Sequence, residues 1–163
     1  MKEKGFTLVE LLGVIIILSI IMLIAIPNVA SMVERSKRDT YMADAKKLVS
    51  LTEYEIKKGN VSRPATGELV KVTLGDLSTT DVEKDSDGNA YDLNDSYVAL
   101  VRKDGYVLYY VQLIARNSNG RISGISLTNS ENLEADNRYD YYDNNWSSVP
   151  TTDSEIRIKI KAD

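Results

Sequence analysis

The sequence predicts an α+β protein in which one long N-terminal helix packs on an antiparallel sheet of about four strands. Three observations support this prediction. An almost uncharged apolar run covers residues 8–33, and an amphipathic helical pattern follows it directly. The second half of the chain then contains short apolar segments separated by turn residues, as expected for strands.

The first half of the predicted helix is long enough to cross a membrane. Residues 11–33 contain no Asp, Glu, Lys or Arg, and about 23 residues at roughly 1.5 Å each reach some 34 Å. Pro27 lies inside this segment. We expect a helix kink near Pro27, because its ring removes one backbone hydrogen bond and clashes with the preceding turn.

Glu10 is a charged residue at the start of this apolar run. An ionised carboxylate in lipid costs a few kcal/mol or more, so such a residue is by default a functional candidate. Two plainer interpretations stay open. One is a secretory signal peptide, although the run is long for one and lacks an A-x-A cleavage site. The other is an uncleaved membrane anchor in which Glu10 is only interfacial.

The helix is predicted to continue through residues 34–58 with one apolar face. Lys57 and Lys58 place positive charge at the negative C-terminal end of the helix dipole, and Gly59 can end the helix in a left-handed conformation. The residues of the apolar face recur at steps of three and four: Val29, Met32, Tyr41, Ala45, Leu48, Thr52 and Ile56, with Met42 and Val49 beside them. This pattern indicates a helix that packs one face on a domain.

Residues 59–95 are predicted to be a connecting loop, with a candidate short strand at 69–72. The segment contains a weak calcium candidate formed by Asp85, Asp87, Asn89 and Asp92. Gly88 comes too early in this segment for an EF-hand loop. We favour a turn in which Asp and Asn side chains bond their own backbone.

Strand patterns occupy residues 96–128 and 156–161. The first range is predicted to be a β-meander with a tight turn at Asp104-Gly105. The second alternates Ile with Arg or Lys and is predicted to be the last strand, with the isoleucines facing the helix. Its cations are interpreted as the solvated face of an edge strand, in preference to a patch for DNA or anionic surfaces.

A polar loop rich in aromatic residues is predicted between these strands, at residues 129–155. Its rings are Tyr139, Tyr141, Tyr142 and Trp146. They are candidates for surface recognition of sugars or proteins. The favoured alternative is that they pack the loop against the edge of the sheet.

The composition excludes several classes of chemistry. The chain has no Cys and no His, so disulfides, thiolate zinc sites and His-based catalysis are ruled out. Its net charge of −4 is unfavourable for a dedicated nucleic-acid site. No pair of carboxylates has a fixed separation that would indicate a glycosidase. We therefore expect a protein that is not an enzyme and has no cofactor.

A resemblance adds a specific interpretation of residues 1–34. The residues Gly5-Phe6-Thr7-Leu8-Val9-Glu10, between a short basic leader and the apolar helix, resemble the class III signal of type IV prepilins and pseudopilins. The resemblance implies cleavage by the prepilin peptidase between Gly5 and Phe6, followed by N-methylation of Phe6. It also implies an assembly role for Glu10, with Thr7 beside it. In this family the glutamate pairs with the N-terminal amine of a neighbouring subunit.

The resemblance further implies the type IV pilin fold and its domain organisation. Residues 1–5 would be the leader, 6–33 the transmembrane and filament-core half of the helix, and 34–163 the soluble head. Such a protein is a single-pass membrane precursor that polymerises with other pilin subunits into an extracellular filament. Its implied partners are the peptidase, an assembly platform and an assembly ATPase.

Other roles stay open. Adhesion, motility, secretion and DNA uptake are not distinguished. A minor pilin, or a pseudopilin of a type II secretion or competence system, is the alternative within the family. An uncleaved, membrane-tethered binding module is the alternative outside it.

Overall fold

The computed structural model describes residues 5–77, 81–116, 122–133 and 149–162. The chain forms two compact units, Met1–Ser36 and Lys37–Asp163. Helix α1 (Leu8–Lys58) supplies residues to both units and is assigned as helix without a break at Pro27. The kink expected at that residue stays a prediction.

The second half of α1 buries the face that the sequence predicted from Tyr41 onward. The buried residues of the helix are Tyr41, Met42, Ala45, Leu48, Val49, Thr52 and Ile56. Val29 and Met32 follow the same spacing but are exposed. The helix ends at Gly59, which has a φ of 85°. Gly59 N–H donates to Ile56 O, and Asn60 N–H donates to Glu55 O at 3.0 Å, so the terminal carbonyls are satisfied.

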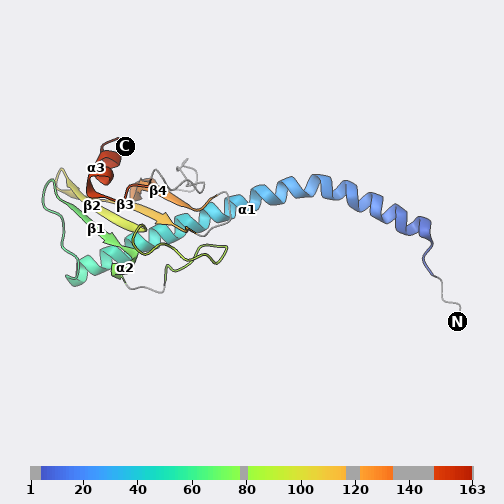
Figure 1. Ribbon diagram of the computed structural model, residues 1–163, viewed down its shortest axis with the longest axis horizontal. Coiled ribbons are helices and arrows are strands. Elements are labelled where there is room, and N and C mark those ends of the chain that lie inside the picture. Colours follow the sequence, from blue (N-terminus) through green and yellow to red (C-terminus); the bar gives the residue numbers. More distant parts are fainter. Residues whose placement is uncertain (1–4, 78–80, 117–121, 134–148, 163) are drawn as a thin grey trace. The chain divides into compact units, whose positions relative to one another are not determined.

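The second unit is an antiparallel sheet with a helix on each face (Figure 1). Its four strands lie side by side in chain order. They are β1 (Leu69–Thr73), β2 (Tyr97–Lys103), β3 (Tyr106–Ile114) and β4 (Gly124–Asn129), with the short helix α2 (Leu74–Leu77) directly after β1. The predicted α+β class is confirmed.

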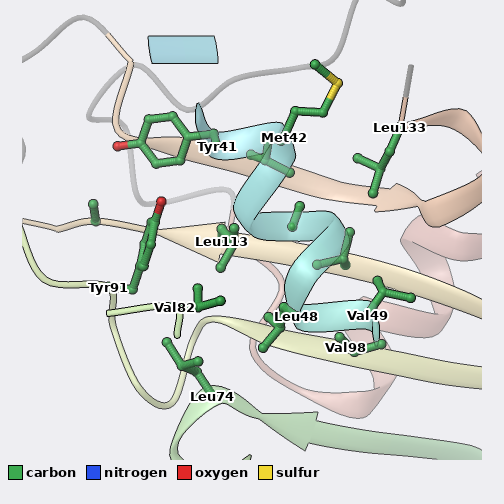
Figure 2. Packing of buried hydrophobic residues seen from close by; sticks show 14 of the residues in the cluster. Tyr41, Met42, Leu48, Val49, Leu74, Val82, Tyr91, Val98, Leu113 and Leu133 are labelled. Atoms are coloured by element: carbon green, nitrogen blue, oxygen red, sulfur yellow. The ribbon is translucent and has the colours of Figure 1, made fainter. Parts of the chain in front are cut away.

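Alternation along the strands divides the apolar side chains between the two faces of the sheet. Val98, Val111 and Leu113 join the α1 side chains in the largest core cluster, part of which Figure 2 shows from close by. Tyr97 and Tyr110 point to the other face. Because both faces are covered, β2 is buried from Tyr97 to Leu100.

The β2–β3 hairpin has the predicted turn. Asp104 and Gly105 have φ values of 52° and 87°, and Lys103 pairs with Tyr106 across the turn. Two successive positive φ angles are typical of a type I′ turn, which suits the twist of a hairpin. The Asp-Gly pair therefore fixes the register of the two central strands.

The prediction of a last strand at residues 156–161 is wrong, because these residues lie in helix α3 (Asp153–Ala162). Ile156 is fully buried and Ile160 partly buried against the sheet, whereas Ile158 is 69% exposed. The two isoleucines that pack against the sheet, Ile156 and Ile160, are thus four residues apart, which is helical spacing. The fourth strand of the sheet is instead β1, which was predicted only as a candidate strand.

A capping box begins α3 and explains why the helix forms. The Glu155 carboxylate accepts hydrogen bonds from Thr152 N–H at 3.0 Å and from Thr151 N–H at 3.0 Å. These bonds satisfy the backbone N–H groups just before the helix and place a negative charge at its N-terminus. Lys159 and Lys161 lie in the last turn, where cations are favourable.

Charge at Glu155 should make α3 sensitive to acid. Hydrogen bonds from Thr152 and Thr151 lower the pKa of Glu155 from 4.5 to about 2. The stabilisation of the fold by the charged Glu155 is therefore present above pH 4.5 and is lost as the pH falls toward 2. Glu155→Gln keeps an acceptor at this position but has no charge to lose. We expect the free energy of unfolding of this variant to fall less between pH 4.5 and pH 2 than that of the native chain. Unfolding of the full chain in detergent at pH 2 to 7 measures this. An equal fall in both chains would contradict the role given to the Glu155 charge.

Two of the predicted loops contain regular secondary structure. The 59–95 connection contains β1 and α2 and is more regular than a loop. The 129–155 loop includes the end of β4, a short 3₁₀ helix (Ser130–Asn132) and the start of α3. Tyr139, Tyr141, Tyr142 and Trp146 lie outside the described residues, so their roles stay predictions.

Candidate functional site

The N-terminus of α1 holds the charged residue that the sequence singled out. Glu10 Oε2 accepts hydrogen bonds from Thr7 N–H at 2.8 Å and from Thr7 Oγ1 at 2.9 Å. In return, Glu10 N–H donates to Thr7 Oγ1 at 3.3 Å. Thr7 and Glu10 therefore form a reciprocal capping box. In the single chain the Glu10 carboxylate already has partners within its own first turn.

The same box occurs at two other helix starts. Thr73 and Asp76 form it before α2, with Thr73 Oγ1 donating to Asp76 at 2.7 Å. Thr152 and Glu155 form it before α3. The signal is a Thr followed three residues later by an acidic residue. Residues 73–77 were expected to cap a single helical turn, whereas the same signal at Thr7 and Thr152 was missed. Local helix capping is thus a structural role of Glu10 beside any role in assembly.

Apolar side chains after this cap are exposed on all sides of the helix. The large apolar residues from Phe6 to Val33 are between 48% and 83% exposed. By length and composition, α1 is the one helix among the described residues that can cross a membrane. An apolar surface of this kind is unfavourable in water and favourable in lipid or against other apolar helices.

Polar side chains inside the apolar segment bond to the helix backbone. Ser19 Oγ donates to Ile15 O at 2.7 Å, and Asn28 Nδ2 donates to Ile24 O at 3.1 Å. Ser31 Oγ donates to Asn28 O at 2.9 Å. Such bonds reduce the cost of placing a hydroxyl or amide in lipid, because at least one donor of each group is satisfied.

The predicted calcium residues do not share one site. Asp85 Oδ1 accepts from the backbone N–H groups of Asp87 at 3.0 Å and Asn89 at 2.8 Å, which is the predicted side-chain-stabilised turn. Asp87 pairs with Lys37 at 2.5 Å, and Asp92 pairs with Arg116 at 2.6 Å. No group of three or more acidic residues that could hold a metal ion occurs within the described ranges.

Two tyrosine–carboxylate bonds tie this loop to α1. Tyr41 Oη donates to Asp85 at 3.0 Å, and Tyr91 Oη donates to Asp44 at 2.7 Å. The two rings meet edge to face at 5.9 Å. Burial raises the pKa of Asp44, while the bond from Tyr91 opposes that rise. The pKa of Tyr91 is also raised, mainly by burial, so its hydroxyl stays a donor.

We expect Asp44→Asn to stabilise the fold slightly at neutral pH. The variant keeps an acceptor for Tyr91 and removes a carboxylate whose pKa is raised on folding. A raised carboxyl pKa means that the folded chain binds more protons. Protonation of the native Asp44 carboxyl therefore favours the fold fully below its ordinary pKa of 3.8. This contribution is lost as the pH rises through the native value, so the advantage of Asn appears above that value. The gain should be below about 1 kcal/mol because water screens the group.

Chemical unfolding of the full chain in detergent, at pH 4 and pH 7, measures this effect. Tyr91→Phe is the matched control, since it removes the bond that lowers the Asp44 pKa and should raise that pKa further. Lower stability of Asp44→Asn than of the native chain at pH 7 would count against this explanation.

Comparison with known proteins adds one finding at the same end of the chain. A family model described as the prokaryotic N-terminal methylation motif matches residues 1–26. Comparisons with curated proteins and with solved structures return no match. The matched range contains the Thr7–Glu10 capping box and most of the exposed apolar segment.

Proposed function

The N-terminal methylation motif supports assignment of the chain to the type IV pilin and pseudopilin family, and from this premise we propose that it is a filament subunit. In this proposal the peptidase cuts between Gly5 and Phe6, and the new amine of Phe6 is methylated. The processed chain then polymerises through the first half of α1. This family consists of structural subunits, and the proposal assigns the chain no catalytic step.

One observation carries the proposal. The motif falls on a helix whose apolar side chains remain exposed all around, from Phe6 to Val33. A membrane buries such a surface before assembly, and a bundle of identical helices buries it afterwards. The head supports polymerisation because its own core is complete without the exposed segment.

Glu10 has a distinct role in each state. In the precursor, the capping box satisfies its Oε2 atom within the chain. Both bonds use the same oxygen, which leaves Oε1 open among the described residues. We infer that the assembled state adds the methylated amine of a neighbouring subunit as a partner, because opposite charges attract strongly where water is excluded.

The proposed partners follow from this cycle. They are the prepilin peptidase, an assembly platform with its ATPase, and other copies of the chain or related pilins. The protein would begin as a single-pass membrane precursor and end in an extracellular filament.

Mass spectrometry of the membrane-bound protein tests the processing step. In a host with an active prepilin peptidase, we expect an N-terminus at methylated Phe6. In the matched strain without the peptidase, the uncleaved chain should accumulate. An intact leader in both strains would contradict the proposal and favour an uncleaved, membrane-tethered module.

A further inference from the structure

One face of the apolar segment of α1 carries a seven-residue repeat. The positions alternate in steps of three and four residues, as in a coiled coil. We call this row the seam. It consists of Thr7, Glu10, Val14, Ile17, Ile21, Ile24, Asn28 and Ser31. All eight residues lie within the first unit of the chain.

Polar side chains are concentrated on the seam. Between residues 7 and 33 the chain has five polar side chains, and four of them are seam residues. The fifth, Ser19, lies on the opposite side of the helix. The remaining seam positions, from Val14 to Ile24, are all β-branched, and each is at least 53% exposed. The seam thus differs in composition from the other faces of the helix.

Asn28 is the seam residue with the largest unused hydrogen-bonding capacity. One N–H of its amide donates to Ile24 O at 3.1 Å. Its second N–H and its Oδ1 atom have no partner among the described residues, and the side chain is exposed. In lipid an amide in this state is costly, and a partner on another helix removes the cost.

We propose that the seam is the contact between the membrane helices of two parallel copies of this chain, with their Asn28 amides hydrogen-bonded to each other. An amide is complementary to itself, since each copy offers both a donor and an acceptor. A two-fold contact uses the same surface patch of both copies, and a residue at its centre meets its own counterpart. Copies inserted in the same orientation are parallel, so Asn28 meets Asn28 at one depth.

Asn28 also sets the register of the contact. A single Asn among apolar seam residues selects register and oligomeric state in parallel coiled coils. Within the seam the attraction must come from the part between Val14 and Ser31, because two Glu10 carboxylates repel each other. Each Glu10 is bonded to Thr7 of its own chain. We therefore expect Glu10→Gln to strengthen pairing, because it removes this repulsion. This inference extends the proposed function, because it names the helix face through which subunits first meet.

Single-cysteine crosslinking of the full chain in phospholipid vesicles tests the pairing. The native chain has no cysteine, so each variant reports one position. Ile24→Cys lies on the seam, and Ile26→Cys is the matched control, at similar depth and about 160° around the helix. With an added membrane-permeant oxidant to take up the two electrons of each disulfide, we expect linked dimers to form about tenfold faster for Ile24→Cys. Equal rates at the two positions would overturn the proposal.

The role of Asn28 is tested in the Ile24→Cys background. Asn28→Leu should slow dimer formation about fivefold, whereas Asn28→Gln should retain most of the rate. Ser19→Leu, a polar-to-apolar change away from the seam, should have no effect. An Asn28→Leu rate equal to that of the parent would refute the amide contact.

Vesicles contain no peptidase, so the result does not depend on processing. Suppose that crosslinking occurs at Ile24→Cys but not at Ile26→Cys, and that the chain is never cleaved in its host. The seam would then be supported and the proposed function refuted. Filaments with methylated Phe6, together with equal crosslinking on both faces, would support the proposed function and refute the seam.

Discussion

Replacing Glu10 by Ala is expected to abolish filaments while the precursor still inserts in the membrane. The change removes a charge from an apolar segment, which favours insertion. It also removes the acceptor for Thr7 N–H and Oγ1, which weakens the capping box at the first turn. Counting filaments by electron microscopy, with precursor quantified in the membrane fraction, should show at least a tenfold loss of filaments.

Glu10→Gln separates the two roles of this residue. Gln can accept the same bonds from Thr7 in a capping box but carries no charge. If the charge is used in assembly, Glu10→Gln should lose filaments as fully as Glu10→Ala. Normal filaments from Glu10→Gln would show that only the cap matters and would contradict the assigned role in assembly.

Gly124→Ala is expected to unfold the head domain. A Cβ atom at this first residue of β4 would lie 2.3 Å from Leu113 O and 3.2 Å from Ile114 Cα. Both neighbours are backbone atoms of the paired strand β3, so neither can move as a side chain can. We expect a loss of about 3 kcal/mol or more. Chemical unfolding of the full chain in detergent measures it.

Ser126→Ala is the matched control on the same strand. Ser126 is buried, and the change removes one atom without adding contacts, so a loss below about 1 kcal/mol is expected. A Gly124→Ala chain as stable as this control would mean that strands β3 and β4 do not approach as closely as the structure indicates.

The parts of the fold that the sequence predicted correctly are those set by local periodicity. The buried face of α1 from Tyr41 to Ile56 follows the predicted spacing. The β2–β3 hairpin forms around Asp104-Gly105 because few other residues tolerate the required φ angles. In both cases neighbouring residues alone determine the structure.

The segment that became α3 shows where periodicity is ambiguous. Its alternation of Ile and cations over residues 156–161 fits a strand, but Ile156 and Ile160 also lie on one side of a helix. The cap favours the helix, since Glu155 N–H donates to Thr152 Oγ1 and the Glu155 carboxylate accepts from Thr152 N–H. The spacing of Thr152 and Glu155 is visible in the sequence, and this helix-start signal outweighs an alternation of only six residues.

The tertiary bonds around Asp85 and Asp44 could not have been predicted. Tyr41 and Asp85 are 44 residues apart, and Asp44 and Tyr91 are 47 residues apart. No local rule links residues at such separations; they meet because the loop before β2 folds back along α1. The Thr7–Glu10 bond is local, by contrast, and the spacing of the two residues is sufficient to predict it.

The most direct test of the proposed function is mass spectrometry of filaments sheared from the surface of the host. We predict that these filaments contain this chain, that it begins at Phe6, and that its N-terminal amine is methylated. Sheared filaments that lack the chain, with all of it retained in the membrane and still carrying residues 1–5, would contradict the proposal that it is a filament subunit.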